Sequence, residues 1–353
     1  MKMFYGKNAS CDAKEATRGL SSPKLIVFTC SENGFDKAVA DIEKLYPGVP
    51  SIGCVGMGYD STILEKGVSV MAFSEGVTVT TGILEGVSKM PARHITRLKS
   101  DIEQVRPGRD NTAIIDFCTG NDAVVLTTLR GLVDKYNLQV MGATGDAGKV
   151  SCNGTIYNDG MTYAVIRNEH GRVKTYKENI YVPKDRSQQL ICSKTDKSKY
   201  YLGELNGRSA KQVYMDLTGT TSDKEIINQT FKNPLGKMIG DDVCIMSIKD
   251  VSGSGLILYR QANDSDILTL LEMRDPMEVA QSTVDRIRAD FNKISGIYSV
   301  NCIFRYLVLK ERGELNSYLG KIASLGTSCG LVGFGEHYNA QFVNQTMTCV
   351  VFE

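Results

Sequence analysis

The chain has 353 residues, of which 42% are hydrophobic, and its 41 Lys and Arg residues nearly balance its 40 Asp and Glu residues. This length exceeds what one core usually holds, so we expect two domains. The balanced charge offers no basic surface, and we therefore expect neither nucleic acid nor an anionic membrane as a partner. No apolar run approaches the roughly 20 residues of a membrane helix. The N-terminus turns polar at once, which predicts a cytoplasmic protein without membrane insertion.

The ten cysteines are scattered along the chain and form no Cys-x-x-Cys pair. Several of them, including Cys30, Cys118 and Cys244, lie inside apolar runs, where a free thiol behaves as a small hydrophobic side chain. The sequence therefore predicts reduced, mostly buried thiols. The three histidines are far apart and form no cluster with cysteines, so we expect no structural metal site.

The first half of the chain alternates short apolar runs with helical patterns. The predicted strands are residues 24–30, 49–52, 67–74, 77–84, 112–118, 139–143, 161–167 and 173–182. The predicted helices are residues 35–45, 95–105 and 123–136. Turn residues predict hairpins at Glu75-Gly76 and at residues 168–171, and Asp122 is expected to cap the helix that follows it.

A polar stretch, residues 184–199, predicts a domain boundary near residue 195. Beyond it, the predicted strands are residues 200–205, 243–248, 256–260, 267–271, 297–302, 304–309 and 346–352. Helices are expected at 210–217, after a capping box at Ser222 and Glu225, after Asp275-Pro276, and at 315–322. The order of strands and helices predicts an α/β protein of the mixed α+β type. Its two domains, residues 1–195 and 196–353, would be built on largely antiparallel or mixed sheets flanked by helices.

Glycine-rich segments follow predicted strands at Gly53–Gly58 and Gly142–Gly148. Neither has the G-x-G-x-x-G order of a dinucleotide site or a Walker lysine. Each is either a tight turn or a ligand loop. In the second segment, main-chain N–H groups would suit an anion, or Asp146 would bind an ammonium group.

A third glycine pair, Gly333 and Gly335, precedes Glu336, His337 and Tyr338. Two close glycines in a strand need a backbone reason, such as a positive φ, a bulge or a segment packed against the main chain. His337 is either a hydrogen-bonding structural residue or a single haem ligand.

Arg305 lies in a predicted apolar strand and must find an acidic partner, for which Glu336 or a ligand carboxylate would serve. Its neighbour Cys302 is either a packed thiol or a nucleophile whose pKa Arg305 lowers. No paired base for such a nucleophile can be named from the sequence.

Several of these segments are similar to those of the FIST family. The second half resembles the C-terminal FIST domain in Glu204-Leu205-Asn206-Gly207 with Tyr214, in Cys302 with Arg305, and in Gly333-Phe334-Gly335-Glu336. The first half resembles the N-terminal FIST domain in Gly142-Ala143-Thr144-Gly145-Asp146 followed by Tyr157-Asn158.

The resemblance implies a sensory module of signal transduction that binds small ligands, usually thought to be amino acids. It also implies a separate output protein as partner. We expect an amino acid or similar small carboxylate to bind in a cleft between the two domains. The candidate ligand-binding residues are Arg305, Glu336, Asn301, Asp146, Asn158 and Tyr338. Two alternatives remain. One is a haem-binding nitric-oxide sensor that uses His337, because one subset of the family binds haem. The other is an enzyme that uses Cys302 or the Glu336/His337 pair; no catalytic residue is assigned.

Overall fold

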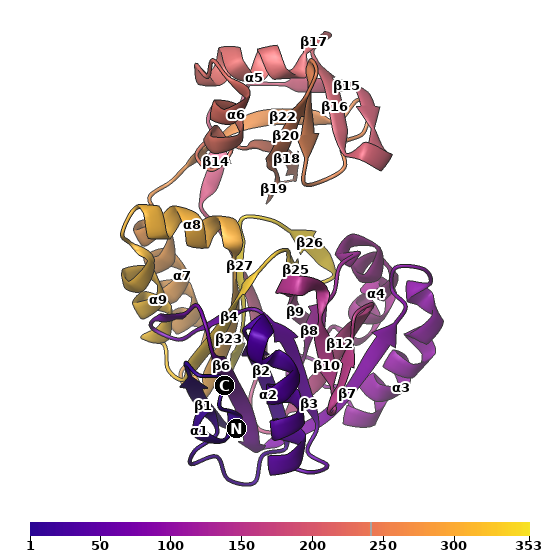
Figure 1. The fold of residues 1–353 in the computed structure, drawn as a ribbon, viewed down its shortest axis with the longest axis vertical. Helices are drawn as coiled ribbons and strands as arrows, with labels where there is room; N and C mark the ends of the chain where they lie inside the picture. Colours follow the sequence, from indigo (N-terminus) through magenta and orange to yellow (C-terminus); the bar gives the residue numbers. More distant parts are fainter. Residues whose placement is uncertain (241) are drawn as a thin grey trace. The chain divides into compact units, whose positions relative to one another are not determined.

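The computed structural model describes residues 1–240 and 242–353 (Figure 1). It separates into two compact units: unit 1 comprises residues 1–178 and 280–353, and unit 2 comprises residues 179–279. This division differs from the predicted boundary near residue 195, because the C-terminal segment packs with the N-terminal half of the chain. All six candidate ligand-binding residues consequently lie in unit 1. The mixed α+β class is confirmed.

Unit 1 repeats one order of elements three times: a strand, a helix, a strand, a helical segment and four strands. Copy 1 contains β1 (Lys2–Asn8), α1 (Ala13–Ala16), β2 (Leu25–Cys30), α2 (Glu32–Leu45), β3 (Ser51–Val55), β4 (Met57–Tyr59), β5 (Ile63–Leu64) and β6 (Val68–Glu75). Copy 2 contains β7 (Val77–Glu85), α3 (Ile95–Val105), β8 (Thr112–Cys118), α4 (Asp122–Tyr136), β9 (Gln139–Thr144), β10 (Val150–Cys152), β11 (Thr155–Tyr157) and β12 (Gly160–Asn168).

Copy 3 has the same order, but unit 2 interrupts it after its first strand. It contains β13 (Val173–Asn179), α7 (Pro276–Asp290), β23 (Gly296–Cys302), α8 (Ile303–Glu311), α9 (Leu315–Ala323), β24 (Ser328–Gly333), β25 (Glu336–Tyr338), β26 (Gln341–Val343) and β27 (Thr346–Phe352). No repeat was predicted from the sequence, so the threefold order is a finding of the structure.

The three copies are held together by exchanged hairpins. Each copy gives four strands to one six-stranded sheet, in the orders β1-β6-β2-β3, β7-β12-β8-β9 and β13-β27-β23-β24. The last two places of these sheets, here called sheets A, C and B respectively, are filled by β10-β11, β25-β26 and β4-β5. Copy 1 therefore completes the sheet of copy 3, copy 2 that of copy 1, and copy 3 that of copy 2. Indigo and yellow strands meet in Figure 1 for this reason.

The two predicted hairpins at the ends of copies 1 and 2 are wrong. Gly76 separates β6 from β7, but β6 pairs with β1 and β2 while β7 pairs with β12. Residues 169–172 likewise link β12 of sheet C to β13 of sheet B. A short polar link between two apolar strands looks the same in sequence whether the strands pair or enter different sheets.

Each sheet of unit 1 has an inner face and a helix-covered face. Side chains from all three sheets, including Val27, Ile115 and Val300, form one shared apolar core. Alternate residues, such as Phe28 and Ile114, instead pack with the helices of their own copy. The side chains of one strand therefore belong to two different environments.

Unit 2 is a separate sheet with two helices, α5 (Ala210–Thr218) and α6 (Asp223–Gln229), and its own core. Its strands are β14 (Tyr181–Pro183), β15 (Leu190–Asp196), β16 (Tyr201–Leu205), β17 (Arg208–Ser209), β18 (Leu235–Ile239), β19 (Asp242–Met246), β20 (Ile248–Ser252), β21 (Gly255–Leu258) and β22 (Ile267–Met273). The capping prediction is confirmed at Ser222, whose hydroxyl accepts from the N–H of Glu225.

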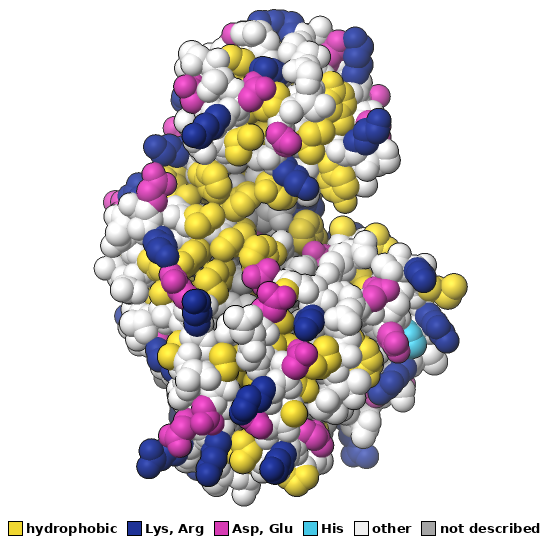
Figure 2. All heavy atoms as spheres, viewed as in Figure 1, with side chains coloured by type: hydrophobic (Ala, Val, Ile, Leu, Met, Phe, Trp, Pro, Cys, Tyr) yellow, Lys and Arg dark blue, Asp and Glu magenta, His cyan; other side chains and the backbone are white. Residues whose placement is uncertain are grey.

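Two expectations about partners concern the surface charge and the helices: no nucleic acid is expected to bind, and no insertion into a membrane is expected. On the face shown in Figure 2, basic and acidic side chains are interspersed, as the balanced charge predicts. Within residues 1–240 and 242–353, no helix is long and apolar enough to cross a membrane.

Two local predictions near the candidate site are also wrong. Residues 304–309 form most of helix α8 rather than a strand, so Arg305 stands in the first turn of a helix. Asp122 is the first residue of α4, and Asn121, with a φ of 60°, occupies the cap position. The Asp122 side chain is thereby free to turn toward the sheet.

Candidate functional site

The glycine segments noted in the sequence are the places where the chain passes from one sheet to another. The third strand of each copy (β3, β9 and β24) runs into a Gly-x-x-Gly segment at its carboxyl end: Gly53–Gly56, Gly142–Gly145 and Gly330–Gly333. A Cβ atom on the second glycine would lie 2.4 Å from Leu331 for Gly56, 2.9 Å from the Val55 carbonyl oxygen for Gly145, and 3.0 Å from Ala143 for Gly333. The bare backbone thus lets three strand ends pass one another closely.

The first glycine of each motif lies between two side chains on neighbouring strands. Across Gly53 these are Phe28 and Ser151, across Gly142 they are Asp116 and His337, and across Gly330 they are Ser299 and Tyr59. In sheet B the pair is a neutral hydrogen bond of 2.9 Å between the two hydroxyls. In sheet C it is ionic, which makes sheet C chemically distinct.

The ionic pair of sheet C is completed by the first turn of α4. His337 Nδ1 lies 2.6 Å from Asp116 Oδ1, and its Nε2 lies 3.5 Å from Asp122 Oδ1. The Thr144 hydroxyl donates to the same Asp122 oxygen. A Cβ on Gly142 would lie 2.4 Å from the Asp116 carboxyl carbon, so only glycine leaves room for this group. We call these four residues, Asp116, Asp122, Thr144 and His337, the histidine cluster.

The histidine cluster is buried and ionised. Burial alone would lower the pKa of His337, but the charge and hydrogen bond of Asp116, with the nearby charge of Asp122, outweigh it and raise the pKa to about 10. Burial raises the pKa of Asp116, and the neighbouring His337 offsets part of that rise. The pKa of Asp122 is lowered: burial opposes ionisation, but the nearby charge of His337 and the hydrogen bond from Thr144 favour it more. At neutral pH the histidine is therefore an imidazolium, and the neighbouring Asp122 is a carboxylate.

Glu336 points to the other face of the same strand, into the inner core. It is fully buried, and its Oε2 accepts hydrogen bonds from the N–H and hydroxyl of Thr346, at 3.2 and 3.0 Å. Its Oε1 has no hydrogen-bond partner among the described residues. Burial raises the pKa of Glu336 to about 7, so it titrates near neutral pH.

Cys302 lies beside Glu336 on the same inner face. Burial and the neighbouring carboxylate raise the pKa of Cys302 well above its usual value. A protonated, 5% exposed thiol is a poor nucleophile. The structure therefore favours the packed-thiol interpretation of Cys302.

Arg305 is completely buried, and its acidic partner is Glu178 rather than the predicted Glu336 or a ligand. Its guanidinium bonds the Glu178 side chain, the Glu178 carbonyl oxygen at 3.2 Å and the Tyr318 hydroxyl at 2.9 Å. The Tyr318 hydroxyl in turn donates to Glu178 at 2.7 Å. These contacts hold α8 and α9 to the last residue of unit 1 before unit 2 begins.

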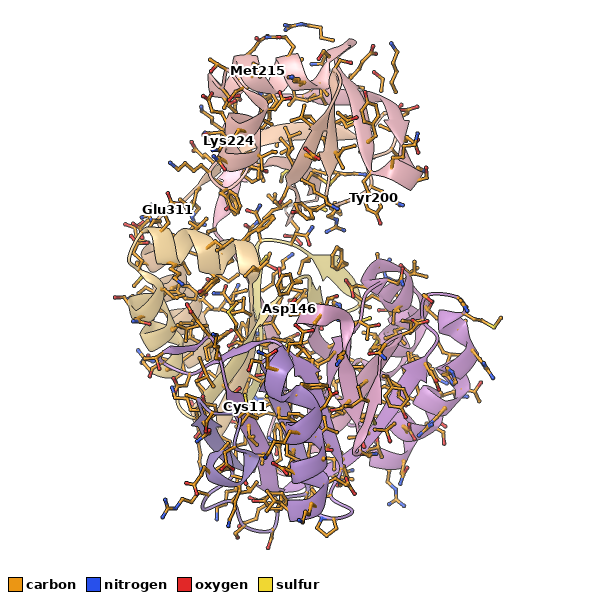
Figure 3. The ribbon with its side chains drawn as sticks, in the orientation of Figure 1. Cys11, Asp146, Tyr200, Met215, Lys224 and Glu311 are labelled. Carbon is orange, nitrogen blue, oxygen red and sulfur yellow. The ribbon has the colours of Figure 1, made fainter. Side chains whose placement is uncertain are left out.

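The other four candidate residues are distributed around the same end of unit 1. Asp146 follows β9, is exposed, and accepts from the N–H of Ala147 (Figure 3). Asn158 is exposed in the turn between β11 and β12. Asn301 is buried at the carboxyl end of β23, and its Oδ1 has no partner within the described part of the chain. Tyr338 is half-buried, with the Lys177 ammonium 5.5 Å from its ring centre.

The structure thus brings together two glycine segments, Gly142–Gly148 and Gly333–Gly335, that the sequence placed in separate domains. β25 pairs with β9, which places Glu336 opposite Ala143 and His337 opposite Gly142. Sequence reasoning missed Asp116, Thr144 and Glu178. The available signal was Asp116 itself, an acid inside the apolar run 112–118, because a buried carboxylate needs a partner.

The histidine cluster does not fit a haem. A haem iron binds a neutral imidazole nitrogen, whereas both nitrogens of His337 face carboxylates and the ring is protonated at neutral pH. Among the described residues, no group of three or more His, Cys, Asp or Glu side chains is arranged to hold a metal ion.

Comparison with known proteins gives one family match. The sequence profile of the FIST N domain matches residues 24–208. A search of curated proteins finds no match. Among solved structures, the chain is similar to a cyanuric acid hydrolase, with 10% identity and a TM-score of 0.36 over 99% of this chain and 98% of that one. A second, PurLQS from Thermotoga maritima, has 12% identity and a TM-score of 0.22 over 99% and 71%. Both scores are too low to support an argument.

Proposed function

The chain belongs to the FIST family, and on this basis we propose that it is a sensory protein of a signal-transduction system that binds a small ligand. FIST domains are signal-transduction sensor domains, and the matched segment spans most of copies 1 and 2. The partners we propose are the ligand and a separate signalling output protein. The assignment of the second half to the C-terminal FIST domain is part of this proposal.

We place the ligand at the carboxyl ends of the parallel strand pairs β8-β9 and β23-β24. Ligands of α/β sheets commonly bind at such ends, where loops rather than strands continue the chain. Asp146 offers an exposed carboxylate there, and Glu336 has one carboxylate oxygen without a partner among the described residues. Both groups suit an ammonium group, so an amino acid or a similar small carboxylate that carries an amine is the proposed ligand.

The remaining candidates differ in how well they suit this role. Asn301, Asn158 and Tyr338 would provide neutral hydrogen bonds to the ligand. Arg305 is the least suited of the six, because Glu178 already occupies its guanidinium. The single observation that carries the proposal is the family match, and the acidic groups beside the sheet crossings support the choice of ligand.

The proposal is tested by thermal-shift and calorimetric titration of the whole chain with amino acids and small carboxylates. A ligand selective for the native state raises the melting temperature. We expect at least one amino acid to do so, and Asp146→Asn to abolish the effect. Asp134→Asn removes an equally exposed acid from the middle of copy 2 and serves as the control. Equal affinity in wild type and Asp146→Asn would remove Asp146 from the site.

A further inference from the structure

Two cysteine thiols of copy 1 lie side by side at the first turn of α2. Cys11, labelled in Figure 3, belongs to the segment between β1 and α1, and Cys30 is the last residue of β2. A Cβ on Gly34, in α2, would lie 2.4 Å from Cys11 Sγ and 3.2 Å from Cys30 Sγ. Both sulfur atoms therefore border the same small space.

Gly34 makes this approach possible. Glycine is unfavourable inside a helix, because it loses more backbone freedom on folding than other residues. At this position a Cβ would lie 2.4 Å from both the Cβ and the Sγ of Cys11, which is closer than real Cβ atoms come. The glycine in α2 thus gives Cys11 the room to reach Cys30.

The main chain holds Cys11 in place. Cys11 has a φ of 60°, in the left-handed region that residues other than glycine rarely adopt. The Asn8 side chain accepts from the N–H of Ser10 at 2.8 Å and from the N–H of Asp12 at 3.1 Å, one on each side of Cys11. Such conformations persist where neighbouring contacts fix them, and they concentrate at functional sites.

The Ser31 side chain also touches the pair. Ser31 occupies the cap position of α2, yet within the described residues its side chain makes no capping bond to that helix. Its hydroxyl accepts from the Gly67 N–H at 3.2 Å and lies 3.3 Å from Cys11 Sγ. Burial raises the pKa of Cys30, the Cys11 thiol adds to the rise, and Ser31 opposes it. Ser31 therefore favours the thiolate that a reaction at Cys30 requires.

The two thiols differ in their access to solvent. Cys30 is completely buried, whereas Cys11 is partly exposed, so a small oxidant reaches Cys11 first. Redox-sensitive cysteines are accessible thiols that stand next to a second, resolving cysteine. We propose that Cys11 and Cys30 are a modification site, at which hydrogen peroxide converts the two thiols into a reversible disulfide.

The reaction consumes one hydrogen peroxide and releases two molecules of water. The Cys11 sulfur attacks one peroxide oxygen, the O–O bond breaks, and Cys11 becomes a sulfenic acid while the other oxygen leaves as water. The Cys30 sulfur then attacks the Cys11 sulfur, the S–O bond breaks, and the hydroxide leaves with the Cys30 proton as the second water. An added thiol reverses the reaction by exchange.

The disulfide would act on a strand crossing. The Cys30 carbonyl oxygen accepts from the Gly56 N–H at 3.0 Å, where the chain passes from β3 in sheet A to β4 in sheet B. Oxidation would therefore tie the segment before α1 to this crossing. The inference does not depend on the ligand proposed above.

The test is treatment of the whole chain with hydrogen peroxide, followed by alkylation of the remaining thiols under denaturing conditions and peptide mapping by mass spectrometry. We expect a peptide pair cross-linked through Cys11 and Cys30, which dithiothreitol separates. Cys11→Ala and Cys30→Ala should each abolish this cross-link. Cys244→Ala changes a partly exposed cysteine of unit 2 and should leave it unchanged. Because Cys11 is partly exposed, the result of Cys11→Ala stands even if Cys30→Ala does not fold.

Gly34→Ala tests the geometry. Its Cβ would displace Cys11 and should slow cross-linking about tenfold, because disulfides form only in a narrow geometry. Gly131→Ala is the matched control, since Gly131 also lies inside a helix, α4, and a Cβ there would meet no atom of the described residues within 4 Å. It should cross-link at the wild-type rate.

The proposal is overturned if both thiols are still fully alkylated after peroxide treatment. It is also overturned if Cys11 accumulates as sulfinic acid in the wild type as it does in Cys30→Ala, since Cys30 would then be out of reach. A cross-link of Cys11 that persists in Cys30→Ala would reject Cys30 as its partner, and equal rates in Gly34→Ala and wild type would reject the geometry on which the proposal stands.

Discussion

Sheets A and C of unit 1 carry the same strand arrangement with opposite chemistry at its centre. In sheet A, Phe28 and Ser151 flank Gly53, the Phe28 ring covers the glycine, and the Ser151 hydroxyl has no partner among the described residues. In sheet C the equivalent positions hold Asp116 and His337. Because sheet A forms without charges, the ion pair of sheet C is not required for the strand crossing.

This difference indicates that the charged pair of sheet C is not explained by the stability of the fold. A buried ion pair costs desolvation energy that its attraction repays only in good geometry, so it is weak evidence of stability. Sheet B lies between the two cases, with a neutral Ser299–Tyr59 bond across Gly330 and the ionic Arg305–Glu178 pair in the helix layer. Sheet C carries a charged pair that its strand arrangement does not need. We therefore expect a chemical role in sheet C.

The largest effect is expected at Arg305. Arg305→Ala leaves Glu178 buried without its cation and should lower the free energy of unfolding by about 3–5 kcal/mol. The sequence predicts Arg305 as a ligand-binding residue, whereas the structure places its guanidinium in a buried ion pair with Glu178. Urea unfolding followed by circular dichroism measures the loss.

The control for Arg305 is the double variant Arg305→Met/Glu178→Gln, which removes both charges and keeps most of the volume. It should recover a large part of the lost stability, because replacing a buried ion pair by neutral groups is often neutral. If the double variant is as unstable as Arg305→Ala, packing rather than the unpaired charge explains the loss.

The second expected effect is a pH dependence of stability, which comes from His337 in the histidine cluster of sheet C. The pKa of His337 rises to about 10 in the folded state from its usual 6.5. The folded state then binds more protons than the unfolded state between these values, so stability is full below pH 6.5 and falls as pH rises toward 10. At pH 7 we expect this group to contribute about 4 kcal/mol.

Asp116→Asn tests that contribution, because it removes the charge that holds the proton on His337. Denaturant unfolding at several pH values should show a shallower fall of stability between pH 7 and 10 in the variant. An unchanged slope would mean that the other titrating groups, and not the histidine cluster, govern stability in this range.

The sequence predicted the local elements better than their assembly. Periodicity found the buried strands at 24–30, 112–118 and 297–302, and Asp275 was correctly predicted to cap the helix from Pro276. Hairpin exchange and the inserted unit were not predictable, because strand pairing depends on distant partners. Arg305 shows the same limit: its need for an acid was clear from its apolar neighbours, but Glu178 lies 127 positions away.

The third effect concerns the inner face of sheet C. The pKa of Glu336 is raised by burial from 4.5 to about 7. The folded state therefore binds the proton more tightly, and stability falls as pH rises from 4.5 to 7. The free energy of unfolding of Glu336→Gln should be about 3 kcal/mol higher than that of the wild type at pH 8 and nearly equal to it at pH 4. Greater stability of the wild type at pH 8 would contradict the raised pKa.

The smallest effect is expected in sheet A, and it tests the comparison most directly. The Ser151 hydroxyl is buried without a partner among the described residues, so it forgoes hydration without gaining a hydrogen bond. Ser151→Ala should therefore raise the free energy of unfolding by up to about 1 kcal/mol. In sheet B, Ser299 flanks Gly330 on the opposite side from the position that Ser151 occupies beside Gly53, and Ser299→Ala removes the bond to Tyr59 and should lower the free energy of unfolding by about 1 kcal/mol. Opposite signs at these two serines beside the crossing glycines, measured by urea unfolding, would show that the strand arrangement is indifferent to polarity and that each copy sets its own chemistry. A loss of stability in both variants would instead mean that Ser151 has a partner, such as a buried water, and that sheet A is less apolar than its residues suggest.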